Sequence, residues 1–70
     1  MLDVNKLKGK LVENCLSVKE ISEILSINPS TFYRKMKANS FEIGEADAIV
    51  KALNLTLAEA CGIFFSQYVA

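Results

Sequence analysis

Residues 17–37, SVKEISEILSINPSTFYRKMK, decide the fold of this chain. Ser17 and Glu20 have the S-x-x-E spacing of a capping box, which predicts a helix that starts at this serine. Asn28 followed by Pro29 predicts a second start, because asparagine caps helices well and proline fits the first helical turn. The turn between the two helices then falls at residues 26–28, and the second helix runs to about residue 37.

The second of these helices is basic. It carries two hydroxyl side chains and three cations but no acidic residue, and Phe32 and Met36, four residues apart, are expected to face inward. Two short helices joined by a tight turn, the second of them basic, have the layout of a helix-turn-helix, whose second helix enters the major groove of DNA. The same cations are also explained by an ordinary solvated helix face.

Three further helices are expected around this pair. The first runs from about Val4 to Asn14, the fourth from Gly44 or Glu45 to Leu53, and the fifth starts at Thr56, which has capping-box spacing to a glutamate. One proline, three glycines and no alternating β-branched run favour an all-α fold. We therefore predict a compact five-helix domain over residues 1–70. Its expected core includes Val4, Leu7, Leu11, Val18, Ile21, Ile24, Leu25, Ala46, Ile49, Val50 and Leu53, with Phe41 and Ile43 as anchors of the loop after residue 37.

Composition narrows the class of protein. The chain has 70 residues, 51% of them hydrophobic, which suits one small domain with a core. No apolar stretch approaches the roughly 20 residues that span a bilayer, and the start does not read as a secretory signal, so a cytoplasmic location is expected. Net charge is zero, but residues 1–37 hold seven basic and four acidic side chains, a net +3, and residues 38–70 a net −3. This asymmetry indicates that the first half faces an anion.

Catalysis and metal binding have no support in the sequence. There is no histidine, and Cys15 and Cys61 do not form a metal-binding motif, so both are expected to be reduced, buried thiols. No nucleophile has a neighbouring base and no glycine-rich loop is present. We expect no enzyme activity, no catalytic residue and no cofactor.

The predicted elements resemble the phage repressor and Cro family, also called the XRE or lambda-repressor-like family, over about residues 3–65. The segments that carry the resemblance are LSVKEISEILSINPSTFYRKMK and FEIGEADAIVKALNLT. Ser22 stands at the small-residue site where the two motif helices cross, and Phe32 at the inward apolar site of the second helix. Ser26 departs from the usual glycine of the turn, where a left-handed backbone is needed, and Val18 departs from a frequent glutamine.

The resemblance implies a sequence-specific regulator that binds double-stranded operator DNA through the helix at residues 29–37, typically as a repressor, in a bacterial cell or a phage-infected host. Arg34 suits guanine because its fork matches O6 and N7 together. The implied base-reading residues are Ser30, Thr31 and Arg34, and the implied backbone contacts are Asn28, Tyr33, Lys35, Lys37 and Lys19, with Lys6 and Lys10 as weaker candidates. Two side chains have alternative explanations: Ser30 and Thr31 favour helix starts in any protein, and Tyr33 is also explained by packing on the fourth helix.

The end of the chain is strongly apolar. Phe64, Phe65 and Tyr68 are expected to make a homodimer contact, since members of the resembled family bind paired half-sites. Alternatively, Ile63 and the two phenylalanines complete the core, or the chain is the DNA-binding part of a longer repressor. A different function also stays open: a helix-turn-helix domain with zero net charge can be a protein-interaction module, such as an antirepressor or adaptor, that does not bind DNA.

Overall fold

The structure is a computed structural model that describes residues 2–65. This part of the chain contains five helices and no strand, which confirms the all-α prediction. The helices are α1 (Val4–Glu13), α2 (Val18–Ile24), α3 (Pro29–Ala38), α4 (Ile43–Ala52) and α5 (Leu57–Phe64). None of them combines the length and the apolar composition that a membrane-crossing helix requires.

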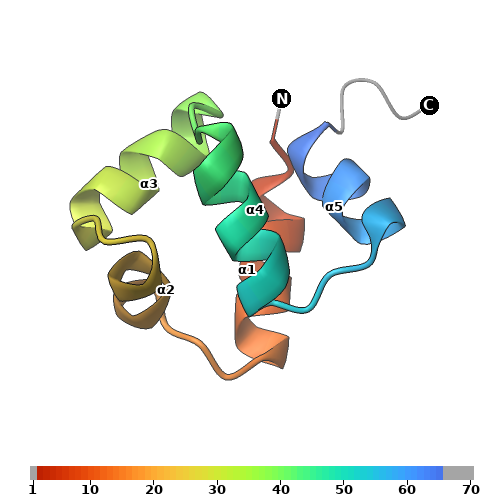
Figure 1. Cartoon of the computed structure of the whole chain (residues 1–70), viewed down its shortest axis with the longest axis horizontal. Coiled ribbons are helices and arrows are strands. Elements are labelled where there is room, and N and C mark those ends of the chain that lie inside the picture. Colours follow the sequence, from red (N-terminus) through yellow and green to blue (C-terminus); the bar gives the residue numbers. More distant parts are fainter. Residues whose placement is uncertain (1, 66–70) are drawn as a thin grey trace.

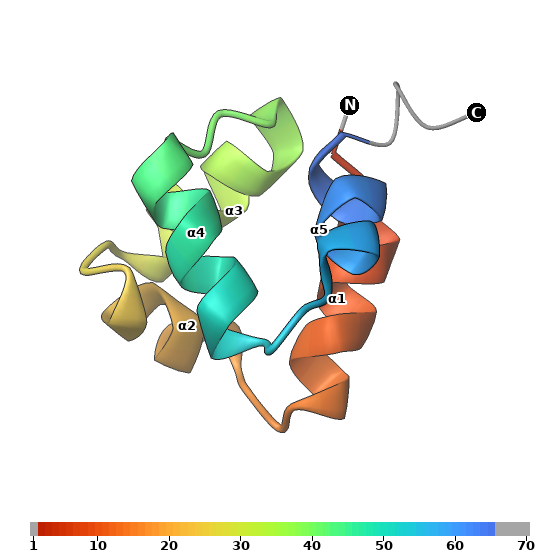
Figure 2. The ribbon, with the colours of Figure 1, turned by 45° about the vertical axis from the view of Figure 1, so that its right-hand side comes forward.

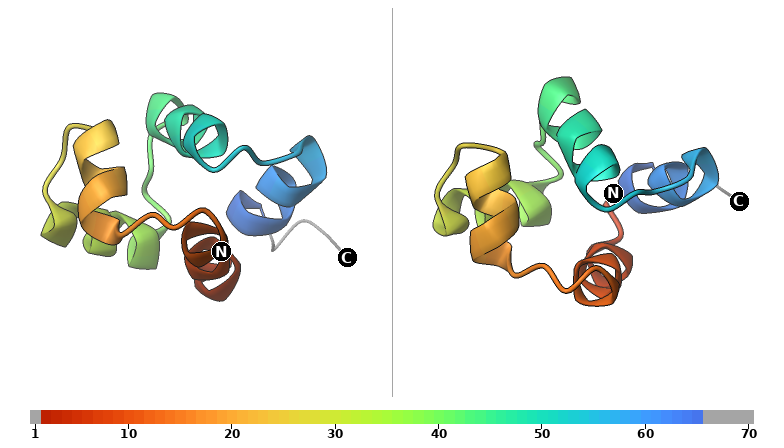
Figure 3. Two further views of the ribbon diagram at one scale, coloured as in Figure 1. Left: turned by 90° about the horizontal axis from the view of Figure 1, so that it is seen from below. Right: turned by 60° about the horizontal axis from the view of Figure 1, so that its bottom comes forward.

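The five helices surround one core. The α2–α3 pair lies at one end of the molecule and α5 at the other, with α1 and α4 between them (Figures 1 and 3). Helices α1 and α5 lie side by side and antiparallel (Figure 2). The amide of Asp3, just before α1, donates to the carbonyl of Ile63, near the end of α5, at 2.8 Å.

Every helix contributes at least one fully buried side chain to the core. These side chains are Leu7, Ile21, Phe32, Ile49 and Ile63, each no more than 1% exposed. Burial of one such side chain contributes about 1.5–3 kcal/mol, and isolated helices shorter than about 12 residues are marginal in water, so tertiary packing holds these helices together. Phe41 is half-buried between Phe32 and Phe64, with ring centroids 5.3 and 6.3 Å away, which confirms it as a loop anchor.

The helix starts follow the capping signals in the sequence. The hydroxyl of Ser17 accepts from the amide of Glu20 at 3.1 Å, and the Glu20 carboxylate accepts from the amide of Ser17 at 3.1 Å. Thr56 and Glu59 form the same pair of bonds at the start of α5. Both predicted capping boxes are confirmed.

Four of the five helices are followed by a non-glycine residue with left-handed backbone. These are Cys15, Ser26, Asn39 and Asn54, with φ between 52° and 59°. The left-handed backbone predicted for Ser26 is confirmed. Asparagine tolerates this conformation, whereas cysteine and serine adopt it at a steric cost.

Several side chains that were expected to be buried are exposed, so these predictions were wrong. Ile24 is 51% exposed because fully buried Ser22 shifts the inward face of α2 toward Ile21 and Leu25. Ile43 is 91% exposed because it is the first residue of α4 and does not anchor the loop. Cys15 is exposed since its left-handed backbone lies beyond the end of α1.

The remaining expected core residues are divided between full and partial burial. Leu11 and Leu53 are buried with the fully enclosed side chains named above. Cys61 is half-buried, so the prediction of a buried thiol was wrong there too. Partly buried side chains pack around the core as expected at Val4, Val18, Leu25, Ala46 and Val50.

Candidate nucleic-acid interface

The outer face of α3 is a continuous exposed stripe. Ser30, Tyr33, Arg34 and Lys37 are all exposed. Tyr33 and Arg34 are each three or four residues from both Ser30 and Lys37, which places the four on one side of the helix. On the opposite side Phe32 and Met36 are buried, as expected. We call these four residues the α3 stripe.

One flank of the α3 stripe is a shallow hollow at the turn between α2 and α3. Asn28 and Thr31 line it together with Glu23, Ser26 and Ile27. Thr31 is half-buried there, so its hydroxyl and methyl lie beside the stripe rather than at its centre. Asn28 is the N-cap of α3, yet its side chain makes no capping hydrogen bond. Its amide group is therefore not used for capping.

The other flank lies between α1, α2 and α3. Tyr33, 44% exposed, lines a hollow with Lys8 of α1 and Val18, the first residue of α2. Lys19 is exposed in the first turn of α2. The sequence analysis did not identify Lys8 as a candidate. The apolar spacing in α1 predicts which face of the helix is buried, but it does not predict which helix lies next to the polar face that carries Lys8.

Lys35 does not join the α3 stripe. Its ammonium Nζ lies 2.8 Å from both carboxylate oxygens of Glu45 on α4, and the two side chains are only 17% and 14% exposed. This ammonium, with the amide of Glu42, lowers the pKa of the Glu45 carboxyl group. The ion pair ties α3 to α4 and gives the Lys35 ammonium a carboxylate partner. The expected phosphate contact by Lys35 stays a prediction, and the interface proposed below does not depend on it.

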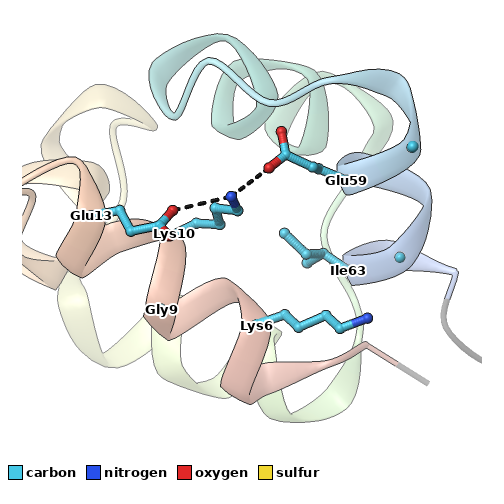
Figure 4. Close-up of a pocket in the computed structure, with 8 residues that line it drawn as sticks. Lys6, Gly9, Lys10, Glu13, Glu59 and Ile63 are labelled. Atoms are coloured by element: carbon cyan, nitrogen blue, oxygen red, sulfur yellow. Dashed lines mark ion pairs between the residues drawn. The ribbon is translucent and has the colours of Figure 1, made fainter.

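The weaker candidates Lys6 and Lys10 lie in a groove between α1 and α5 (Figure 4). Lys10 is placed between Glu59 and Glu13 and makes ion pairs with both. Its hydrogen bond to Glu59, together with the amide of Thr56, lowers the pKa of that carboxyl group to about 2. Neither lysine shares a hollow with α3 residues, so both are dropped as DNA contacts.

The three residues expected to form a dimer contact differ in their exposure. Phe64 is 6% exposed and belongs to the core, so it is wrong as a contact for a second chain. Phe65 is 55% exposed and lines a hollow with Ile43, Ala46 and Phe41. Tyr68 lies outside the described residues.

Ion pairing divides the cations of the described residues into two groups. Between residues 2 and 65, Lys6, Lys10, Lys35 and Lys51 make ion pairs. The cations without such a partner in this part of the chain are Lys8, Lys19, Arg34 and Lys37. Arg34 and Lys37 belong to the α3 stripe, Lys8 lines the hollow that contains Tyr33, and Lys19 is exposed on α2. Ammonium and guanidinium groups beside hydroxyls and a phenol can bind phosphates and base edges.

The same residues, 2–65, contain no group of three or more metal-ligating side chains that could hold an ion. Comparison of the chain with protein-family models, with curated proteins and with solved structures found no match.

Proposed function

We propose that this chain is a sequence-specific DNA-binding regulator of the lambda-repressor-like helix-turn-helix type, with α3 as the helix that enters the major groove. The observation that carries the proposal is the α3 stripe. It is polar and basic, contains no acidic residue, and lies on a helix whose opposite face is anchored by Phe32 and Met36. A rigid helix with one such face supports readout of base edges.

Three side chains are proposed to read bases. Arg34 at the centre of the stripe would donate two hydrogen bonds to guanine O6 and N7. Ser30 is exposed in the first turn of α3 and Thr31 lies at the flank, so serine would meet a base edge and threonine a base or a thymine methyl.

The surrounding groups are proposed to hold phosphates. Lys8, Lys19 and Lys37 have no ion-pair partner among residues 2–65, and Tyr33 and Asn28 offer a hydroxyl and an amide on the two flanks. Such contacts fix the orientation of α3 without reading sequence. We further propose that two copies occupy paired half-sites about one DNA turn, roughly 34 Å, apart and act as a repressor.

The proposal is tested by selection of random DNA duplexes with the intact chain at two salt concentrations, followed by measured affinities. Arg34→Ala is expected to weaken binding to the selected site by about 1–3 kcal/mol, roughly 5- to 150-fold, because one bidentate base contact is lost. Lys51→Ala is the control, since Lys51 lies on α4 and pairs with Asp47. Equal losses in both variants, or no enriched sequence, would contradict the proposal.

The salt dependence of the DNA-binding constant gives a second test of the α3 stripe. Each phosphate neutralised by a cation contributes a slope of about −0.9 to log K against log salt. Lys37→Ala is therefore expected to make the slope shallower by about 0.9 while leaving the selected sequence unchanged.

A second candidate function is a protein-interaction module, and one observation favours it. Ile43 and Phe65 are 91% and 55% exposed and line the same hollow, so two large apolar side chains are exposed side by side. In that case, DNA selection would enrich nothing at either salt concentration. A partner isolated with the intact chain would then be lost on Phe65→Ser but retained on Arg34→Ala.

A further inference from the structure

The second half of α2 and the turn that follows it, residues 22–27, bury little apolar surface. We call these residues the 22–27 segment. Within it Ile24 is 51% exposed, and Leu25 and Ile27 are only partly buried. The one side chain of the segment that is fully buried belongs to Ser22, which is polar. Opening of the segment, by which we mean local loss of its helix and turn, therefore exposes little apolar surface, while the preceding Ile21 keeps its place in the core.

The hydroxyl group of Ser22 favours this opening. Ser22 is 0% exposed, and its Oγ atom has no hydrogen-bond partner among residues 2–65. A buried hydroxyl without a partner is less stable than the same hydroxyl in water, because it loses its hydrogen bonds to solvent. The closed segment therefore carries a cost that opening relieves.

Two further residues of the segment act in the same direction. Glu23 is the next-to-last residue of α2, where a carboxylate lies near the negative end of the helix dipole, and it makes no ion pair among residues 2–65. The last turn of α2 contains no cation, whereas the last turns of α1, α3 and α4 each contain lysine. Ser26 has left-handed backbone, with a φ of 59°. Three unfavourable features thus lie within five consecutive residues.

The end of α4 is a matched comparison within the same chain. Each helix is followed by three amides that donate to carbonyls four, three and five residues earlier: those of Leu25, Ser26 and Ile27 at α2, and those of Leu53, Asn54 and Leu55 at α4. At α4, however, Leu53 is 2% exposed, the last turn contains Lys51, and the left-handed residue is an asparagine. The backbone hydrogen bonds match, so the difference between the two helix ends lies in their side chains.

We propose that the 22–27 segment is a conformational switch that opens while the rest of the core stays folded, and that DNA selects its closed form. Three residues of the segment line the hollow beside the α3 stripe, together with Asn28 and Thr31, so this flank of the interface is complete only when the segment is closed. A ligand that binds one form better shifts the population toward it. Selection by DNA rests on the proposed function, whereas opening is a property of the free chain.

The first test is hydrogen exchange of backbone amides in the intact chain without DNA, followed by NMR. After correction for intrinsic exchange rates, the three amides at the end of α2 are expected to exchange about tenfold faster, or more, than the three matched amides at the end of α4. Equal protection at the two helix ends would overturn the proposal, because the segment would then open no more often than the end of α4.

The second test uses substitutions. Ser22→Ala is expected to slow exchange of the three α2 amides about fivefold or more, because the closed form no longer buries an unpartnered hydroxyl. Ser22→Cys should act in the same direction, although cysteine is no better a helix former than serine, because a thiol tolerates burial. Unchanged exchange in both variants would overturn the proposal.

Ile63→Val is the matched control for unfolding of the whole chain. Ile63 is 1% exposed and lies on α5, at the other end of the molecule from α2 (Figure 1). Its truncation lowers global stability. Exchange of the three α2 amides is expected to stay unchanged, because the segment opens without α5. Acceleration of these amides by the full loss of global stability would show that they exchange only when the whole chain unfolds, and would overturn the proposal.

The third test adds the DNA site selected from random duplexes. Saturating DNA is expected to slow exchange of the three α2 amides about tenfold or more, because DNA binds the closed form. Unchanged exchange in a chain that binds this DNA would overturn selection by DNA. If no DNA site is enriched, the proposed function fails and selection by DNA fails with it, whereas opening of the free chain is decided by the first two tests. The two failures are therefore distinguishable.

Discussion

Ser26 shows how one residue of the turn between α2 and α3 carries strain. Its φ is 59°, which glycine adopts without steric cost and a residue with a Cβ does not. The amides of Ser26 and Ile27 both donate to carbonyls of α2, at 3.1 and 3.0 Å, so the turn is held by hydrogen bonds despite the strain. The position of α3 depends on this turn.

Ser26→Gly is expected to raise the free energy of unfolding by about 0.5–1 kcal/mol. Relief of the left-handed conformation contributes about 1–2 kcal/mol, and the larger entropy of the unfolded glycine chain offsets part of it. Urea titration measures the change. Ser26→Ala is the control and should have little effect, because alanine keeps the Cβ and the strain. Destabilisation by glycine would show that the Ser26 side chain supports the turn.

At the scale of the element, the two helices of the proposed motif start by different means. Helix α2 has only seven residues and depends on the capping box of Ser17 and Glu20. Helix α3 starts with Asn28 and Pro29, and the asparagine side chain makes no capping bond. Proline at the first position already has the φ that a helix needs, so α3 begins without that bond.

This difference predicts that two alanine substitutions affect different properties, one the stability of the fold and the other DNA binding. Ser17→Ala is expected to lower the free energy of unfolding by about 1 kcal/mol, because the amide of Glu20 loses the hydroxyl to which it donates. Asn28→Ala is expected to change stability by much less but to weaken DNA binding, since its amide is free for a phosphate. Thermal unfolding and DNA titration of both variants separate the two roles. Equal destabilisation by both would mean that the Asn28 side chain caps α3 in solution.

At the scale of the whole molecule, two ion pairs between helices join parts distant in sequence. Lys35 and Glu45 connect α3 to α4, and Lys10 and Glu59 connect α1 to α5. The first pair orients the proposed reading helix against the core, and the second closes one end of the α1–α5 groove. Both pairs lower the pKa of their glutamate.

The lowered pKa values predict a loss of stability in acid. A carboxyl group with a lower pKa in the folded chain stabilises the fold above its unfolded pKa, and this contribution is lost as pH falls toward the folded value. For Glu59 the window runs from 4.5 down to about 2. Chemical unfolding between pH 7 and pH 2 should therefore show decreasing stability below about pH 5.

Glu59→Gln should make this decrease shallower, because glutamine retains a capping side chain but does not titrate. Glu23→Gln is the control, since Glu23 makes no ion pair among residues 2–65. A pH profile of Glu59→Gln identical to that of the unaltered chain would show that the ion pair with Lys10 does not form in solution.

The helices and most of their inward faces could be predicted because their signals are local. Capping boxes, the Asn-Pro pair and apolar spacing act within one or two turns, so Ser17, Thr56, Phe32 and Met36 were placed correctly. The errors at Ile24 and Ile43 lie at helix ends, where exposure depends on which neighbouring helix passes nearby and not on periodicity.

The sequence by itself determined five helices, the starts of α1, α2, α3 and α5, and a basic, acid-free face on α3, because these follow from capping, backbone preference and helical period. Only the tertiary structure decided which cations remain on that face. Lys35 on α3 is paired with Glu45, ten residues away, and Lys8 on α1 lies beside Tyr33. Lys10, also on α1, is paired with Glu59, 49 residues away. An ion pair requires two charged groups within a few ångströms of each other. Packing of the core brings such groups together, and no local sequence pattern predicts which groups will meet.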